Sequence, residues 1–173
     1  ELVVTGALAT PEWRIILAPV LGGLFVGLFA KYFMPGGKPQ GVQHVIEASA
    51  LRAGRMSARQ GLGAVVISAA SIGSGASVGR EGPAVHLGAA LASYLGRPFH
   101  FTRSQSRTLL GCGVAAAVAA SFNAPIAGVF FALEVVIGHY ALSAFAPILI
   151  ASVCGTIVSR IYFGDYPAFI VPA

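Results

Sequence analysis

Charged side chains are scarce in this sequence. Asp, Glu, Lys and Arg together make up only 10% of its 173 residues, whereas a soluble domain carries about 25%. Apolar residues make up 56% of the chain, and the mean hydropathy is +0.80. The composition therefore argues against a soluble domain and predicts a protein that lies in lipid.

Cysteine is nearly absent as well. Cys112 and Cys154 stand inside apolar runs, with no second metal-binding side chain nearby. This arrangement argues against a zinc site and against a disulfide framework. We expect both cysteines to be small buried apolar residues, and we expect no metal and no cofactor.

Acidic residues number only six, and of these Glu81 and Glu134 alone fall deep within apolar stretches. A cation or proton pathway normally needs several acidic residues in its spans, so this class is disfavoured. The eleven basic residues lie between the apolar runs rather than in one cluster, which argues against nucleic-acid binding. They are densest in residues 31–60, and the positive-inside tendency places that connection in the cytoplasm.

The apolar runs predict an all-α integral membrane fold with unequal and interrupted helices. Crossing the hydrocarbon core takes about 20 apolar residues in a helix, and irregular backbone survives there only if it is buried in protein or lines a cavity. The expected elements are a span at 11–34, a short helix at 42–51, a basic loop at 52–59, helices at 61–79 and 83–96, a second basic loop at 97–107, two broken helices within 108–133, and a span at 135–159 that includes His139 and Tyr140.

Small residues surround a charged pair in residues 75–83, which read GASVGREGP. Pro83 favours the start of a helix, where the first N–H groups lack internal partners and the helix dipole is positive. Such a turn can bind an anion with neutral backbone. The carboxylate of Glu81 either competes with a mobile anion as a gate, or it satisfies the helix N-terminus or pairs with Arg80.

Two segments match a known family. Residues 79–83 read GREGP and residues 122–128 read FNAPIAG, and together they resemble the GREGP and FNAPLAG motifs of the CLC family of chloride channels and chloride–proton exchangers. The resemblance covers nearly the whole chain. It implies that residues 1–173 are a partial transmembrane domain, the first of two inverted repeats without its opening helix, built from broken and re-entrant helices and without a soluble domain.

The resemblance also implies a function. We expect passive transport of chloride or a similar small anion, without enzymatic activity, by a homodimer embedded in the lipid of the plasma (inner) membrane. In the family, the glutamate at the position of Glu81 is the external gate. The residues expected to bind the anion are Gly79, Arg80, Glu81, Gly82, Gln40, Gly41 and Val42.

Two positions depart from the family pattern. Gln40 stands where the family's central-site serine aligns, so the resemblance does not imply chloride over nitrate, although an amide N–H can still donate to an anion. Val135 occupies the position of the exchangers' internal proton-transfer glutamate, and valine cannot carry a proton. This difference favours a channel. A proton-coupled antiporter is the alternative, and we expect a structural role for Glu134.

Two other classes of function compete with transport. An intramembrane serine hydrolase would need Ser74 within about 3 Å of His86 or His139, but serines among small residues usually serve helix packing, and His86 is more often a satisfied core histidine. A purely structural role in assembly is the other class, because residues 124–137 and 140–160 correspond to dimer contacts in the family. The apolar side chains that could form such contacts, or face lipid, are Phe130, Phe131, Leu133, Ile137, Leu142 and Ile148.

Overall fold

Helices form all the regular structure of the described residues. The computed structural model describes residues 12–138 and 142–164, and within these ranges it has no β-strand. The elements in chain order are α2 (Glu12–Phe33), η1 (Pro35–Gly37), α3 (Val42–Leu51), α4 (Ala58–Gly73), α5 (Glu81–Gly96), η2 (Arg97–Phe99), α6 (Arg103–Phe122), α7 (Pro125–Phe131), η3 (Ala132–Ile137) and α8 (Leu142–Phe163). The prediction of an all-α fold is confirmed.

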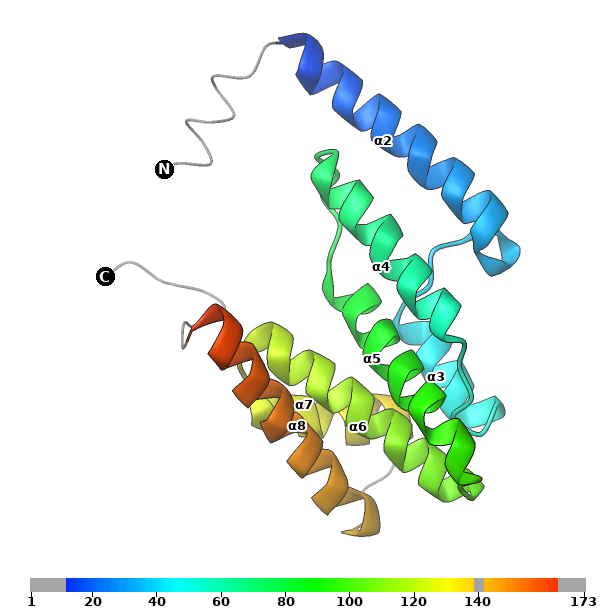
Figure 1. Ribbon diagram of the computed structural model, residues 1–173, viewed down its shortest axis with the longest axis vertical. Helices are drawn as coiled ribbons and strands as arrows, with labels where there is room; N and C mark the ends of the chain where they lie inside the picture. The colour runs from blue at the N-terminus through cyan, green and yellow to red at the C-terminus, as the bar shows by residue number, and fades with distance from the viewer. Residues whose placement is uncertain (1–11, 139–141, 165–173) are drawn as a thin grey trace.

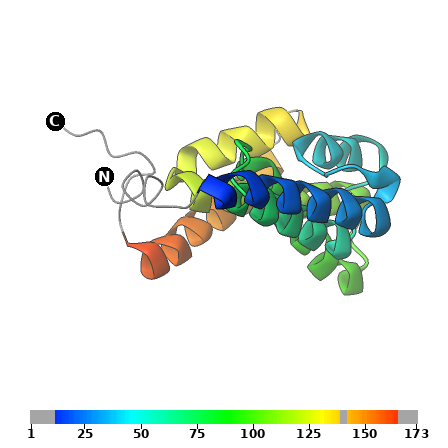
Figure 2. The same cartoon turned by 90° about the horizontal axis from the view of Figure 1, so that it is seen from above.

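The long helices pack in the order α2, α4, α5, α6 and α8. In Figure 1, α2 runs beside α4 at one edge of the molecule, and α8 lies against α6 toward the other edge. The view in Figure 2 shows α3 and the α7–η3 segment along the same side of these helices. Since α3 also packs on α5 and η3, α3 and the α7–η3 segment cover one side of the central helices.

The expected break near residue 123 is confirmed. α6 ends where Asn123 adopts a φ of 54°, and α7 begins at Pro125. Asn is one of the few residues that tolerate left-handed backbone, and proline suits the first position of a helix. The two residues therefore end one helix and begin the next.

Two other helix ends differ from the prediction. The helix expected at 61–79 is α4, which ends at Gly73 because Gly75 has a φ of +93°, a backbone conformation that a right-handed helix cannot contain. α5 begins at Glu81 rather than at residue 83. Pro83 therefore lies inside the first turn, where its missing N–H costs no hydrogen bond.

The single span expected at 135–159 is wrong. Residues 132–137 continue α7 as the π-helical segment η3, and Gly138 ends it with a φ of +76°. α8 then forms a separate helix that runs to Phe163. His139 and Tyr140 lie outside the described residues.

The second basic loop is shorter than expected, because α6 starts at Arg103. Thr102 Oγ1 accepts a hydrogen bond from the Gln105 N–H at 3.3 Å, and Gln105 Oε1 accepts one from the Thr102 N–H at 3.0 Å. This reciprocal capping box satisfies two of the N–H groups that a helix start leaves free. The first turn of α6 therefore replaces the end of the expected loop.

Glycine lets the central helices approach closely. Gly88 on α5 faces Gly113 on α6, and a methyl group on either residue would collide with the carbonyl oxygen of the other. A methyl group on Gly155 of α8 would lie 2.8 Å from the Ala116 carbonyl oxygen of α6. Membrane helices gain their packing contacts from such close approach. The α5–α6–α8 unit therefore fixes the position of the start of α5.

Large apolar side chains cover the outside of α2 and α8. Two stretches, Ile15–Phe33 and Leu142–Phe163, are long and apolar enough to cross a membrane. Ile16 on α2 is 67% exposed and Ile161 on α8 is 74% exposed. Cys154 is also exposed on α8, contrary to the prediction.

Candidate functional site

The start of α5 holds the GREGP turn. Arg80 is the N-cap residue, and the Ala84 N–H donates to its carbonyl oxygen at 3.1 Å, which closes the first turn. The N–H groups of Glu81 and Gly82 precede this bond and have no acceptor within the helix. Gly79 and Arg80 are exposed, while Glu81 and Gly82 are half-buried. The positive end of the α5 dipole is therefore accessible to an anion.

The carboxylate of Glu81 folds back over the residues that precede it. A Cβ atom on Gly79 would lie 2.8 Å from Glu81 Oε2, so the carboxylate occupies space that only glycine leaves open. Among the described residues, the side chain of Glu81 forms no ion pair with Arg80, whereas Glu47 Oε1 pairs with Arg52 Nη2 at 2.7 Å. The carboxylate therefore lies at the helix start without a cation that would hold it there.

The start of α3 is capped by an imidazole. The N–H of Gly41, the N-cap residue, donates to His44 Nδ1 at 3.2 Å, and the His44 N–H donates to the Gly41 carbonyl oxygen at 3.1 Å. The first of these bonds is the half of a capping box in which the side chain three residues on caps the N-cap N–H, with histidine at the position that Glu or Gln usually takes. The Gly41 N–H, which the sequence assigned to the anion, is therefore occupied by a side chain of the protein.

The two helix starts lie side by side. A Cβ atom on Gly82 would lie 4.0 Å from the Cα atom of Gly41, which is ordinary van der Waals contact. Gln40, which precedes Gly41, is only 8% exposed. The fold therefore brings together two segments that were predicted separately to bind the anion. The positive electrostatic potentials of the two helix N-termini add where they meet.

A polar cavity of about 350 Å³ lies beside the start of α3. His86 of α5 lies on its wall, fully buried, and neither of its ring nitrogens has a hydrogen-bond partner among the described residues. The rings of His44 and His86 meet edge to face, with centroids 6.3 Å apart. His86 is therefore a buried core histidine, as expected, whose ring nitrogens find no partner among the described residues.

Sequence reasoning also missed His44. The available signal was its position, three residues after Gly41 and in the first turn of α3, where a side chain can reach back to the N-cap N–H. That signal is weak, because this position is usually filled by Glu or Gln and because His44 and His86 are far apart along the chain. The approach of the two rings depends on the packing of α3 against α5.

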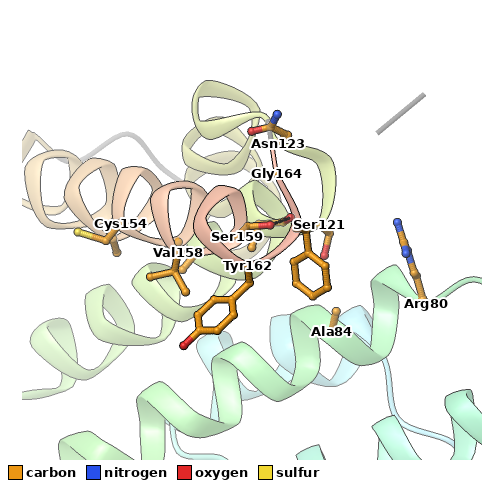
Figure 3. Close-up of a pocket in the computed structure, with 14 residues that line it drawn as sticks. Arg80, Ala84, Ser121, Asn123, Cys154, Val158, Ser159, Tyr162 and Gly164 are labelled. Atoms are coloured by element: carbon orange, nitrogen blue, oxygen red, sulfur yellow. Dashed lines mark hydrogen bonds between the residues drawn. The ribbon is translucent and has the colours of Figure 1, made fainter. Parts of the chain in front are cut away.

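A larger cavity, about 820 Å³, opens between α5, α6 and α8. Figure 3 shows Arg80 at its edge, across from Tyr162 and Val158 of α8. Ala84, Ala116 and other small or apolar residues make up most of the wall. The wall of this cavity is therefore mainly apolar, in contrast to the cavity beside the start of α3.

Val135 lies on η3 rather than on a spanning helix, and it is 39% exposed. Its side chain is apolar, so it cannot accept or donate a proton. Glu134 precedes it in the first turn of η3.

The two basic segments, 52–59 and 97–107, lie at the same end of the bundle. Arg97 Nη2 donates to the Met56 carbonyl oxygen at 2.9 Å, and Arg103 Nη2 donates to the Ala50 carbonyl oxygen at 3.2 Å. The two segments were predicted as separate loops. The hydrogen bonds place both on the same side of any membrane that the bundle spans.

The geometry does not support the hydrolase alternative within the described residues. Ser74 Oγ donates to the Ser71 carbonyl oxygen at 2.9 Å, whereas the ring nitrogens of His86 have no partner, so no Ser–His pair forms. His139 lies outside the described residues.

Three of the side chains proposed for an apolar assembly face are buried inside the chain instead. Leu133 and Ile148 have no exposed surface, and Ile137 is 6% exposed. They pack in the core formed by α3, α5, α6, η3 and α8. Phe130, Phe131 and Leu142 are at least partly exposed, and Leu142 is the most exposed of them at 93%.

Comparison with known proteins identifies the family. The voltage-gated chloride channel model matches residues 22–173. The chain belongs to the CLC family. Members of this family are channels or transporters of the membrane, so the chain is part of an integral membrane protein.

Several CLC relatives align along nearly the whole chain. A ClcB-like protein of Ralstonia nicotianae is 38% identical over 98% of this chain and 40% of its own length. The channel ClcB of Yersinia pseudotuberculosis is 31% identical over 93% of the chain and 39% of its own length. The chloride channel protein CLC-e of Arabidopsis thaliana is 32% identical over 92% of the chain and 23% of its own length. The chain thus spans less than half of these relatives, and no solved structure matches it.

Proposed function

We propose that this chain is part of a protein that moves chloride or a similar small anion across a membrane, with Glu81 as its gate. The observation that carries the proposal is the meeting of two helix starts at Gly41 and Gly82. Backbone N–H groups and helix dipoles at this point attract an anion without a full positive charge. An ion that is held in this way can also leave, as conduction requires.

The position of Glu81 supports its role as the gate. Its carboxylate lies at the start of α5 and has no ion-pair partner among the described residues. It carries the same charge as the transported ion, so the two compete for the same N–H groups. Protonation of the carboxylate, or its displacement, removes the competitor, and we therefore expect anion flux to rise as the pH falls.

We propose a passive channel rather than an exchanger. Val135 stands where an internal proton carrier is expected from the family resemblance, and an exchanger must move protons by a defined route. The relatives from Yersinia and Arabidopsis are named as chloride channels.

The decisive experiment measures anion efflux from liposomes that contain the full-length parent protein, with a pH electrode in the external solution. Wild type is compared with Glu81→Gln, which keeps the shape of the side chain and removes its charge. We expect flux at neutral pH to rise by about tenfold, which corresponds to about 1.4 kcal/mol of competition by the carboxylate. The matched control is Ser77→Ala, which changes an exposed side chain in the segment between α4 and α5 and should leave the flux unchanged.

Each outcome of this experiment decides a different part of the proposal. The channel proposal holds if Glu81 controls the flux and a chloride gradient never drives protons uphill. Protons driven in a fixed ratio to anions, and lost in Glu81→Gln, would identify an antiporter instead. No anion flux from the folded protein would overturn the transport proposal itself.

We further propose that the parent protein is a homodimer in the plasma membrane, with the two basic segments in the cytoplasm. The exposed apolar residues Phe130 and Leu142 are available to a partner subunit or to lipid. Light scattering of the full-length protein in detergent tests the dimer. Labelling of an Arg55→Cys variant by an impermeant thiol reagent added from outside would contradict the orientation.

A further inference from the structure

The start of α3 differs from the start of α5 in having a titratable acceptor on its N-cap N–H. The Gly41 N–H donates to His44 Nδ1 at 3.2 Å. A neutral imidazole can accept this bond only through an unprotonated nitrogen, so the ring carries its proton on Nε2. In the charged ring both nitrogens are donors, and the bond from Gly41 is then impossible.

We propose that His44 couples protonation to anion binding at the start of α3. In its neutral form it occupies the Gly41 N–H, and in its protonated form it releases that N–H and adds a positive charge beside it. This inference rests on the proposed function, since it assigns a control to the same anion site. His44 is a positioning residue in this scheme, because it acts through the Gly41 N–H.

The cost of protonating His44 depends on whether an anion is present. A positive ring at a helix start opposes the helix dipole, and the released N–H has no acceptor. An anion at the same place reverses both effects, since it accepts the N–H and attracts the imidazolium. Proton binding and anion binding therefore strengthen each other, and by linkage the coupling is equal in the two directions.

The cavity beside His44 provides a second, independent reason to expect a titratable site. His86 is fully buried on its wall, and neither ring nitrogen has a partner in the described part of the chain, whereas buried polar groups normally have a partner such as water. A volume of about 350 Å³ has room for several water molecules of roughly 30 Å³ each. Water in this cavity would satisfy His86 and would carry the proton between bulk water and His44.

Other ionisable groups face His44 in this cavity and set its electrostatic surroundings. Among the described residues they are Glu47 on α3, Arg52 and Arg55 in the segment that follows it, and His86 on α5. Glu47 and Arg52 neutralise each other through a 2.7 Å ion pair. Arg55 and His86 oppose a charge on His44, so an anion at the Gly41 N–H is needed to stabilise that charge.

The test separates His44 from Glu81, because in these proposals a proton on either side chain favours the anion. Efflux is measured from full-length protein at about pH 5.5 and pH 8, which bracket the ordinary titration range of imidazole. In the Glu81→Gln background, where the gating carboxylate no longer titrates, we expect flux to be about fivefold higher or more at the lower pH, a typical size for such coupling. The ratio should fall to about one in Glu81→Gln/His44→Gln, because Gln keeps the cap and cannot titrate.

The matched control is His100→Asn in the same Glu81→Gln background. His100 is an exposed histidine with a φ of 51° between η2 and α6, a conformation that asparagine also tolerates. This variant should keep the full pH ratio. A ratio that survives His44→Gln, or that is lost in His100→Asn, would overturn the proposal for His44.

A second measurement detects the proton itself rather than the flux, on protein that elutes as a folded species in size-exclusion chromatography. Chloride added to weakly buffered Glu81→Gln protein should cause proton uptake, and the same addition to the His44→Gln double variant should cause none. Anion flux without proton uptake would contradict the role of His44 and leave the proposed function standing. Absence of any anion flux from folded protein would instead contradict the proposed function.

Discussion

The starts of α5 and α3 use the same backbone device with different side chains. At α5 the N–H groups face an acidic side chain, Glu81, which folds back toward Gly79. At α3 the N-cap N–H faces a basic side chain, His44, at 3.2 Å. An acidic group competes with an anion when it is charged, whereas a basic group releases the site when it is charged. If both proposals hold, the two helix starts should become more favourable to an anion as the pH falls, for opposite chemical reasons.

The largest effect is expected when the two starts are moved apart. Gly113→Ala places a methyl group against the Gly88 carbonyl oxygen at the closest contact of α5 and α6. Forced separation of these backbones should cost about 3 kcal/mol or more and shift α5 relative to α3. We expect loss of monodisperse protein in size-exclusion chromatography and a lower melting temperature in detergent.

The control for this change is Gly27→Ala on α2, where no described residue lies within 4 Å of the added methyl group. It should leave the elution profile and the melting temperature unchanged. Equal behaviour of the two variants would show that the α5–α6 contact does not hold the helix starts together.

An intermediate effect is expected when only the start of α5 is disturbed. A Cβ atom on Gly79 would lie 2.8 Å from Glu81 Oε2, so Gly79→Ala must push the carboxylate out of its place while the charge remains. Holding the carboxylate at the helix start would then cost about 0.5–1.5 kcal/mol more. The carboxylate competes less well with the anion by that amount, so we expect anion efflux at neutral pH to rise roughly two- to tenfold. The same substitution at Gly73, where an added Cβ atom would have no atom of the structurally described residues within 4 Å, should have no effect on efflux.

The smallest effect is expected when only the support of α3 is weakened. Arg107 Nη2 donates to the Ile137 carbonyl oxygen at 2.9 Å, and its Nε donates to Ser49 Oγ of α3 at 3.4 Å. Arg107→Ala should lower stability by about 0.5 kcal/mol, because the lost bond to Ile137 is given the low end of the usual net contribution and the 3.4 Å bond to Ser49 adds little. Thermal unfolding in detergent measures the loss, and exposed Arg59→Ala provides the control. A loss as large in Arg59→Ala would mean that general surface charge, not the anchor on α3, is responsible.

Much of the fold could be predicted because local signals agree with the final structure. The break between α6 and α7 follows from Asn123 and Pro125, both of which act within one turn. The predicted helix ends were wrong where a single glycine with positive φ interrupts an apolar run. Gly75 ends the extension of α4, and Gly138 separates η3 from α8, although both lie in runs that hydropathy alone reads as continuous.

The candidate site was predictable only in part. Residues 79–83 predicted a helix start with an acidic side chain, because a helix start depends mainly on residues that are neighbours in the sequence. His44 and His86 did not stand out, because a histidine in an apolar run gives no sign of its partner. Their rings meet at 6.3 Å only after α3 packs on α5.

The apolar composition, the helical elements and the two glycine-bearing helix starts follow from the amino-acid sequence alone, because they depend on side-chain hydropathy and on backbone preferences within a few residues. Three features appear only in the folded chain: Gly41 and Gly82 meet, His44 occupies an N–H expected to serve the anion, and His86 is buried without a partner among the described residues. These features depend on contacts between helices that are distant in the chain, and the close approach of Gly88 and Gly113 fixes one side of that arrangement.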